Sequence, residues 1–195
     1  MKTHRLVIVL LAFSLCSCGG GDPVGKGPPR RDGIQVQGGQ FFGAVRMPTF
    51  QYVKEKEGGC ADLFFHKGTA DDREVLWIAA EKDKLALPVK GMKTFDLSAA
   101  PDGLQVAVDL WEAAPRFSAY CNDISADTRK EATWRAKKGK ITLTLFEPMD
   151  PKQVGPKTHR ASVRLHGVVF EDDAGHQATL KEETITEVLV GWYAG

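Results

Sequence analysis

The chain has 195 residues, with 26 basic and 25 acidic side chains and a formal net charge of +1. A domain that binds duplex nucleic acid needs a strong basic excess on one face, so this balance argues against nucleic acid as a partner. No repeat of fixed period is visible, and the length fits one domain of ordinary size after any leader is removed.

The first residues form a short basic segment followed by an apolar run. Lys2 and Arg5 precede the unbroken apolar stretch 6–13, which is far shorter than the ~20 residues needed to cross a bilayer. Glycines follow at 19–21. This pattern is typical of a cleaved signal peptide rather than of a transmembrane or core helix.

The segment Leu15-Cys16-Ser17-Cys18 resembles the lipobox of bacterial lipoproteins, with Leu15 three residues before Cys18 and Ser17 directly before it. Cys16 departs from the small or β-branched residue usual at its position. The resemblance implies a signal peptide at 1–17, acyl chains such as palmitate on Cys18, and a lipid anchor in the bacterial cell envelope. Gly19 follows in place of the Asp that retains enteric lipoproteins in the inner membrane. We therefore expect the outer membrane, with the inner membrane as the alternative.

Residues 18–33 are rich in glycine, proline and charge and show no apolar periodicity, which predicts the lipidated cysteine followed by a flexible tether. Residues 34–195 then form a single predicted domain. Outside the leader, this domain resembles no characterised family.

Four cysteines are present. If the leader removes Cys16 and lipid modifies Cys18, then Cys60 and Cys121 remain, and an oxidising compartment favours one disulfide between them. Two free buried thiols or a metal-binding pair are the alternatives, although no CxxC spacing supports a metal. In the chain-entropy model, such a bridge contributes roughly 4 kcal/mol at most.

Short β-branched and aromatic runs alternate with turn residues, and only 123–131 could form a helical turn. Hairpins are predicted around 67–72, 137–140 and 172–175, with a bulge near Glu182-Glu183. The run 75–80 is apolar on both faces, which predicts a core position for Trp77. The expected strands cover 40–45, 50–54, 60–66, 74–80, 84–89, 94–97, 104–110, 118–121, 133–136, 141–146, 160–171 and 176–192.

This pattern predicts an all-β, antiparallel β-sandwich with one disulfide. By resemblance to immunoglobulin-like sandwiches, the disulfide would cross between two sheets. The tryptophan and tyrosine-corner patterns of that family are not matched.

We expect no catalytic residue, no cofactor and no metal. The sequence contains no GxSxG or SxxK motif. The spacing of Asp123, Ser125 and Asp127 suits a calcium loop, but Thr128 and Trp134 stand where glycine and glutamate are required, so a helix cap is the better interpretation. The histidines are interpreted as surface or turn residues: His66, His159, His166 and His176.

Trp111 has the opposite parity to the inward residues of 104–110 and lies between Asp109 and Glu112. An exposed tryptophan here would form a partner-binding platform, while a bulge that turns it inward is the alternative. The resulting hypothesis is a lipid-anchored, non-catalytic binding or assembly module that contacts an envelope protein or glycan. The alternative function is an envelope hydrolase with catalytic residues on loops.

Overall fold

The computed structural model describes residues 35–37, 40–42, 45–115, 120–121, 127–148 and 158–191. The chain divides into two compact units, residues 1–44 and 45–195. In the first unit, β1 (Gln35–Gln37) pairs antiparallel with β2 (Gln40–Phe42). The predicted signal peptide, the lipidation site Cys18, the tether and the domain boundary at 33–34 lie outside the described residues.

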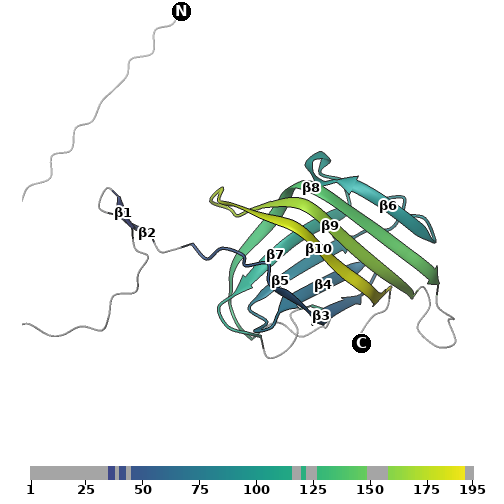
Figure 1. Ribbon diagram of the computed structural model, residues 1–195, viewed down its shortest axis with the longest axis horizontal. Helices are drawn as coiled ribbons and strands as arrows, with labels where there is room; N and C mark the ends of the chain where they lie inside the picture. Colours follow the sequence, from purple (N-terminus) through teal and green to yellow (C-terminus); the bar gives the residue numbers. More distant parts are fainter. Residues whose placement is uncertain are drawn as a thin grey trace, which may run out of the picture. The chain divides into compact units, whose positions relative to one another are not determined.

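The second unit contains one eight-stranded sheet, in which every pairing is antiparallel. The strands follow the order β10-β9-β8-β7-β5-β4-β3, and β6 also pairs with β8 (Figure 1). The expectation of an all-β antiparallel fold is therefore confirmed. The elements are β3 (Tyr52–Cys60), β4 (Phe64–Thr69), β5 (Glu74–Ala80), β6 (Gly91–Asp96), the short 3-10 helix η1 (Leu97–Ala99), β7 (Leu104–Trp111), β8 (Lys130–Pro148), β9 (His159–Glu171) and β10 (Gln177–Val190).

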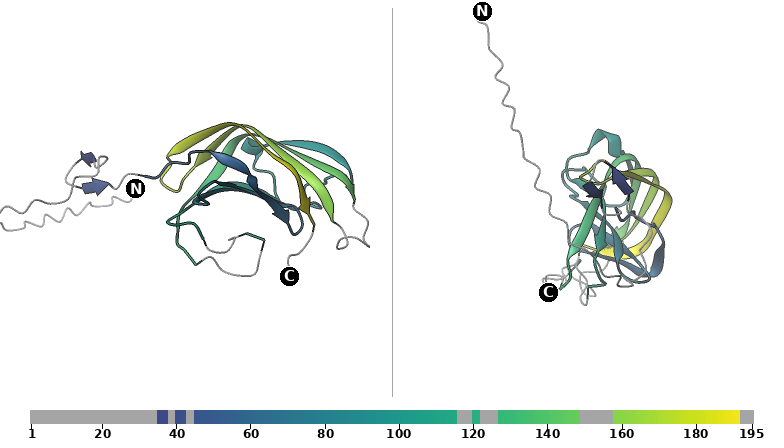
Figure 2. Two further views of the ribbon diagram at one scale, coloured as in Figure 1. Left: turned by 60° about the horizontal axis from the view of Figure 1, so that its bottom comes forward. Right: turned by 90° about the vertical axis from the view of Figure 1, so that its left-hand side faces the viewer.

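The strands β3 to β10 of the second unit form one continuous sheet that curls back on itself until β10 approaches β3 (Figure 2). Among the described residues of this unit, the strands do not divide into the two packed sheets of the expected sandwich. The physical reason is that β8, β9 and β10 are long strands that bend, so one sheet encloses the core in a nearly closed, barrel-like arrangement.

The concave face of this sheet buries the hydrophobic core. Alternate residues point inward along each strand, as the period of a pleated sheet requires. Trp134 is fully buried in this core. The same core cluster contains aliphatic residues from four strands, among them Leu76, Ile78, Val108, Ile141, Leu143, Val163 and Leu165.

Side chains bridge the gap where β3 meets β10. The Lys67 ammonium lies 2.8 Å from both Glu57 Oε1 and Glu183 Oε1, and all three side chains are largely buried. Glu57 also accepts a hydrogen bond from the backbone N–H of Thr186 at 3.1 Å. Burial disfavours the charged amine, but the two glutamates outweigh it and raise the pKa of Lys67. This ion cluster satisfies buried charges at the closing edges of the sheet.

The hairpin predicted around 137–140 is wrong, because β8 runs through these residues as one strand. Gly139 has a φ of +112° and lies within a bulged stretch of the β8–β9 ladder. A Cβ there would lie 2.6 Å from the carbonyl oxygen of Gly167. The glycine therefore serves a bulge and a close backbone approach, whereas the sequence pattern Lys-Lys-Gly-Lys suggested a turn.

The terminal hairpin is confirmed, with β9 and β10 joined through 172–176. In β10 the inward parity changes between Leu180 and Ile185, close to the predicted bulge. The ladder itself shifts register later, between Ile185 and Val188.

Three other expected elements are not seen as such among the described residues. Residues 84–89 form turns and bends rather than a strand, and the described residues 120–121 form a bend. Most of the helical turn expected at 123–131 lies outside the described residues.

Candidate functional site

The sheet forks along β8. The first part of β8 pairs with β7, ending at Arg135 opposite Ala107. The later part pairs with β6, beginning at Lys140 opposite Asp96. Residues 136–139 thus have neither β6 nor β7 as a partner on this side, and the turn containing η1 lies beside the gap. A strand that changes partners in this way leaves space between the two branches.

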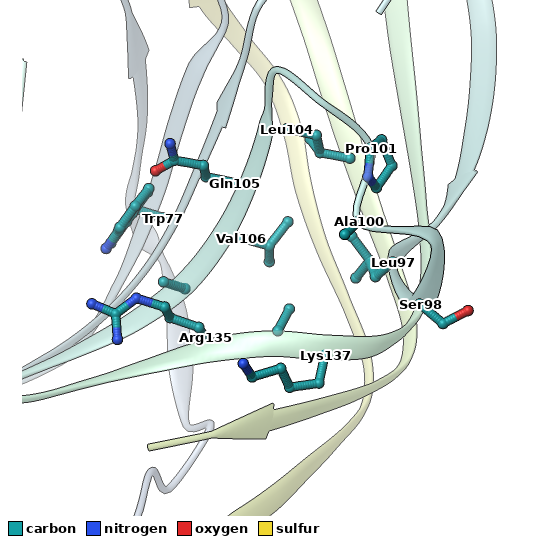
Figure 3. A pocket seen from close by; sticks show the side chains of 12 residues that line it. Trp77, Leu97, Ser98, Ala100, Pro101, Leu104, Gln105, Val106, Arg135 and Lys137 are labelled. Atoms are coloured by element: carbon teal, nitrogen blue, oxygen red, sulfur yellow. The ribbon is translucent and has the colours of Figure 1, made fainter. Parts of the chain in front are cut away.

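A pocket of about 560 Å³ occupies this fork, and we call it the fork pocket (Figure 3). Its volume is in the range of small-molecule sites. One part of its lining is apolar, and the other carries an amide, a hydroxyl and two cationic side chains. The lining residues are Trp77, Leu97, Ser98, Ala100, Pro101, Leu104, Gln105, Val106, Ala107, Arg135, Ala136 and Lys137.

Trp77 is part of this lining, and it is half-buried on the outer face of the sheet. The prediction that it belongs to the core is therefore wrong. Its neighbours Leu76 and Ile78 point inward and are fully buried. The outer face of β5 is apolar because Phe64 covers it, with its ring stacked 6.0 Å from the Trp77 ring. A run that is apolar on both faces therefore marks a strand covered on both sides, not a central core position for each residue.

Asp109 fixes the orientation of Trp77. Its carboxylate is 1% exposed and accepts a hydrogen bond from Trp77 Nε1 at 3.0 Å. Tyr120 Oη and Thr133 Oγ1 also donate to it, at 2.7 and 2.6 Å, and the Lys130 ammonium lies at 2.8 Å. A buried carboxylate is tolerated when donors surround it in this way. We call this group of five residues the Asp109 cluster.

The Cys60–Cys121 disulfide holds the Asp109 cluster closed, and its presence confirms the predicted pairing. Its two Cα atoms are 5.6 Å apart, and Tyr120 precedes Cys121 directly. The bridge thereby ties the segment carrying Tyr120 to the end of β3. Because the bridge joins a strand end to a segment lying over the outer face, it does not link two packed sheets.

Tyr120 lies among aromatic rings on this outer face. Its ring stacks against Phe64 at 5.8 Å and against His66 at 6.0 Å. Burial, reinforced by the charge of Asp109, raises the pKa of Tyr120 well above its usual value. Burial also lowers the pKa of His66, which favours the neutral imidazole. These shifts describe groups sequestered from water.

The expectation of an exposed platform at Trp111 is wrong, because Trp111 is only 6% exposed. Its parity was assigned correctly, since it shares the outer face with Asp109. However, Tyr120 packs edge-on against the indole, with ring centroids 6.5 Å apart. The Lys130 ammonium lies 5.4 Å from the centre of the same ring. A covering segment buries this residue, so the basis for a partner-binding role at Trp111 is lost.

The two cations of the fork pocket have acidic neighbours outside it. Arg135 Nη1 lies 2.7 Å from Asp173 Oδ1, and Lys137 Nζ lies 4.0 Å from Glu171 Oε1. These side chains are largely exposed apart from Glu171. Ion pairs of this kind are weak, because water screens them and the side chains retain their mobility. The cations therefore remain available to an incoming ligand.

The histidines and cysteines considered as possible metal ligands do not converge. Within the described ranges, no group of three or more histidine, cysteine, aspartate or glutamate residues is placed to hold a metal ion. His159 is buried at the start of β9, so its interpretation as a surface or turn residue is wrong. His166 is exposed, and His176 Nδ1 lies 2.8 Å from Asp172 Oδ2 at the hairpin tip. Both cysteines of the described domain are in the disulfide.

Sequence analysis did not identify Gln105, Arg135 or Lys137 as site residues. Gln105 and Asp109 share one face of β7 with the same alternation that placed Trp111, which was the available signal. The sequence pattern did not predict the fork, because it indicates two separate strands, 133–136 and 141–146, where the structure has the single strand β8.

Comparison with known protein families, with curated proteins and with solved structures finds no match. Among the described residues, no helix has the length and apolar character required to span a membrane. The functional argument therefore depends on the residues of the chain itself.

Proposed function

We propose that this protein is a lipid-anchored component of the bacterial cell envelope and that its β-domain is a non-catalytic binding module for envelope glycans. The support for the anchor is the leader and its lipobox-like end at Cys18. The support for binding is the fork pocket, which joins an aromatic wall to a few polar groups. Of these, the pocket is the observation that carries the function.

The composition of the fork pocket suits a glycan. The indole of Trp77 offers a flat apolar surface to the C–H groups of a sugar ring, and Gln105 offers both a donor and an acceptor for hydroxyl groups. Ala107, which pairs with Trp77 in the β5–β7 ladder, lies beside the indole on the same face. In Figure 3, Trp77, Gln105 and Arg135 lie toward one side of the pocket and the apolar residues of the η1 turn toward the other.

The same lining favours binding over hydrolysis. The residues described around the pocket include no carboxylate, imidazole or thiol. The one hydroxyl belongs to Ser98, whose Oγ donates to Asp96 Oδ1 at 2.6 Å. Hydrolysis of a glycosidic bond by the usual route needs two carboxyl groups flanking the bond. This lining supplies positions for recognition only.

A glycan array tests the binding proposal, using the full-length protein in detergent. We expect the wild type to bind at least one saccharide and Lys137→Ala to lose at least about half of that signal. Lys138→Ala is the matched control, because Lys138 is the next residue, is also exposed and carries the same charge, but does not line the pocket. The absence of any bound saccharide, or an equal loss for both variants, would overturn the proposal.

Metabolic labelling tests the anchor. Radiolabelled palmitate should mark the wild-type protein and leave Cys18→Ala unlabelled. Equal labelling of the two proteins would refute lipidation at this residue.

A further inference from the structure

The fork pocket has an unbalanced charge. Arg135 and Lys137 are the ionisable residues among those that line it, and both are cations. The side chain of Arg135 has a planar guanidinium whose paired N–H groups match the two oxygens of a carboxylate. A neutral glycan would leave this positive charge unused, so the lining favours an anionic ligand.

A carboxylate of the protein already occupies the guanidinium of Arg135. Asp173, in the turn between β9 and β10, places Oδ1 2.7 Å from Arg135 Nη1. The Asp173 side chain is 86% exposed and that of Arg135 is 56% exposed. A ligand carboxylate can therefore displace Asp173 at little cost, because an exposed ion pair contributes little stability.

The lining also favours a particular structure for the part of the ligand next to the carboxylate. Trp77 lines the pocket while its indole is held by Asp109 and stacked against Phe64. A preorganised indole binds a ring without first losing side-chain freedom. Ala107 lies opposite Trp77 in the β5–β7 ladder, and Arg135 lies opposite Ala107 in the β7–β8 ladder, so the three residues share one face of the sheet. The geometry thus combines a flat apolar wall with a carboxylate-binding cation.

We propose that the fork pocket binds cyclic sugar acids of the uronic acid class, with the ring against Trp77 and the carboxylate on Arg135 in place of Asp173. This inference rests on the proposed glycan-binding function and narrows it to one ligand class. It also assigns Asp173 a role as an internal competitor, whose carboxylate lowers the apparent affinity for acidic ligands.

Isothermal titration with a matched pair of sugars tests the ligand class. Methyl β-D-glucuronide and methyl β-D-glucoside share one ring and differ by the carboxylate. We expect the full-length protein in detergent to bind the glucuronide about tenfold more tightly, as one well-placed charged contact allows. Acetate, which has the carboxylate without the ring, should bind more weakly than the glucuronide. Arg135→Gln should remove the preference between the two sugars.

The Asp173→Asn variant tests the displacement. Loss of the internal carboxylate should tighten glucuronide binding by up to about fivefold, the limit set by the weakness of an exposed ion pair. Binding of the glucoside should stay unchanged. Glu187→Gln is the control, because it also removes one exposed acid but breaks a pair with Arg160, at the opposite end of β9 from Glu171.

The outcomes separate the two proposals. Equal affinity for the two sugars would overturn the sugar-acid inference and leave the glycan-binding function standing. Unchanged glucuronide affinity in Asp173→Asn would overturn the displacement. If neither sugar binds and the array also shows no bound saccharide, the proposed function itself fails.

Discussion

The Asp109 cluster provides the sharpest test of how the outer face is organised. Asp109→Asn keeps the shape of the side chain but replaces the charge with an amide. In the wild-type protein, the Asp109 carboxylate accepts hydrogen bonds from three neutral donors and lies next to one ammonium, at distances of 2.6–3.0 Å. A hydrogen bond to a charged group contributes roughly 1.5–3 kcal/mol, against about 1 kcal/mol for a neutral one.

The expected loss follows from these contacts. Weakening the retained hydrogen bonds costs about 1 kcal/mol each, and an amide N–H facing a donor adds about 1–3 kcal/mol for the group left unpaired. If the amide oxygen takes the place of Oδ2, the bonds from Trp77 and Tyr120 are retained and that from Thr133 is lost, so we expect Asp109→Asn to lower the free energy of unfolding by about 3–5 kcal/mol. Tyr120→Phe removes one donor and should lower it by about 1.5–2 kcal/mol.

The assay is equilibrium unfolding in guanidinium chloride, followed by circular dichroism with the disulfide kept oxidised. The double variant should fall short of the sum of the two single effects by about 1 kcal/mol, because both residues belong to one network. Asp102→Asn, which changes an exposed carboxylate at 89% exposure, should cost less than about 0.5 kcal/mol. A loss below about 1 kcal/mol for Asp109→Asn, or strict additivity, would refute the role assigned to the cluster.

Three further predictions concern the fold. Replacing Cys60 and Cys121 by serine should cost about 2–4 kcal/mol in the free energy of unfolding and should raise the proteolytic sensitivity of the segment between β7 and β8; an unchanged unfolding midpoint would contradict this. Burial lowers the pKa of His66, so as the pH falls the unfolded chain binds a proton at this residue before the folded protein does, at about pH 6.5. The free energy of unfolding should therefore decrease as the pH drops below that value. His66→Phe should flatten this part of the pH profile, and an unaltered slope would argue against the prediction. Gly139→Ala should lower the free energy of unfolding by about 1–3 kcal/mol more than the control Gly175→Ala. Both glycines have a positive φ, but only at Gly139 do backbone atoms lie where the Cβ would be. Equal losses would show that the close approach is unimportant.

Localisation gives a prediction that depends on the leader alone. Gly19→Asp should shift the protein from the outer to the inner membrane fraction in an enteric host, where that residue acts as a retention signal. An identical distribution of both proteins in a sucrose gradient would contradict outer-membrane sorting by this rule.

Local patterns predicted the parts of the fold that depend on neighbouring residues. Strict alternation placed β7, and the turn residues at 172–175 placed the terminal hairpin. Cys60 and Cys121, the two cysteines beyond the expected lipidation site, predicted the disulfide. In each case, the period of a strand or the chemistry of a short segment was sufficient.

The errors concern contacts between segments that are distant in the sequence. Gly139 looked like a turn residue because its packing against Gly167 is invisible without the β8–β9 pairing. Alternation along β7 predicts the correct face for Trp111 but not its burial, because it does not show that Tyr120 covers the indole. The fork pocket exists because β8 changes partners from β7 to β6, which no local pattern encodes.

The central claim is that ligand binds in the fork pocket against Trp77, and side-chain NMR tests it most directly. The indole N–H signals of ¹⁵N-labelled full-length protein in detergent can be followed during titration with methyl β-D-glucuronide or with a saccharide identified on the array. The Trp77 signal is assigned by its loss in Trp77→Phe. We predict that this signal shifts and saturates while the signal of Trp134, fully buried in the core, stays in place. An unmoved Trp77 signal under saturating ligand would contradict the account.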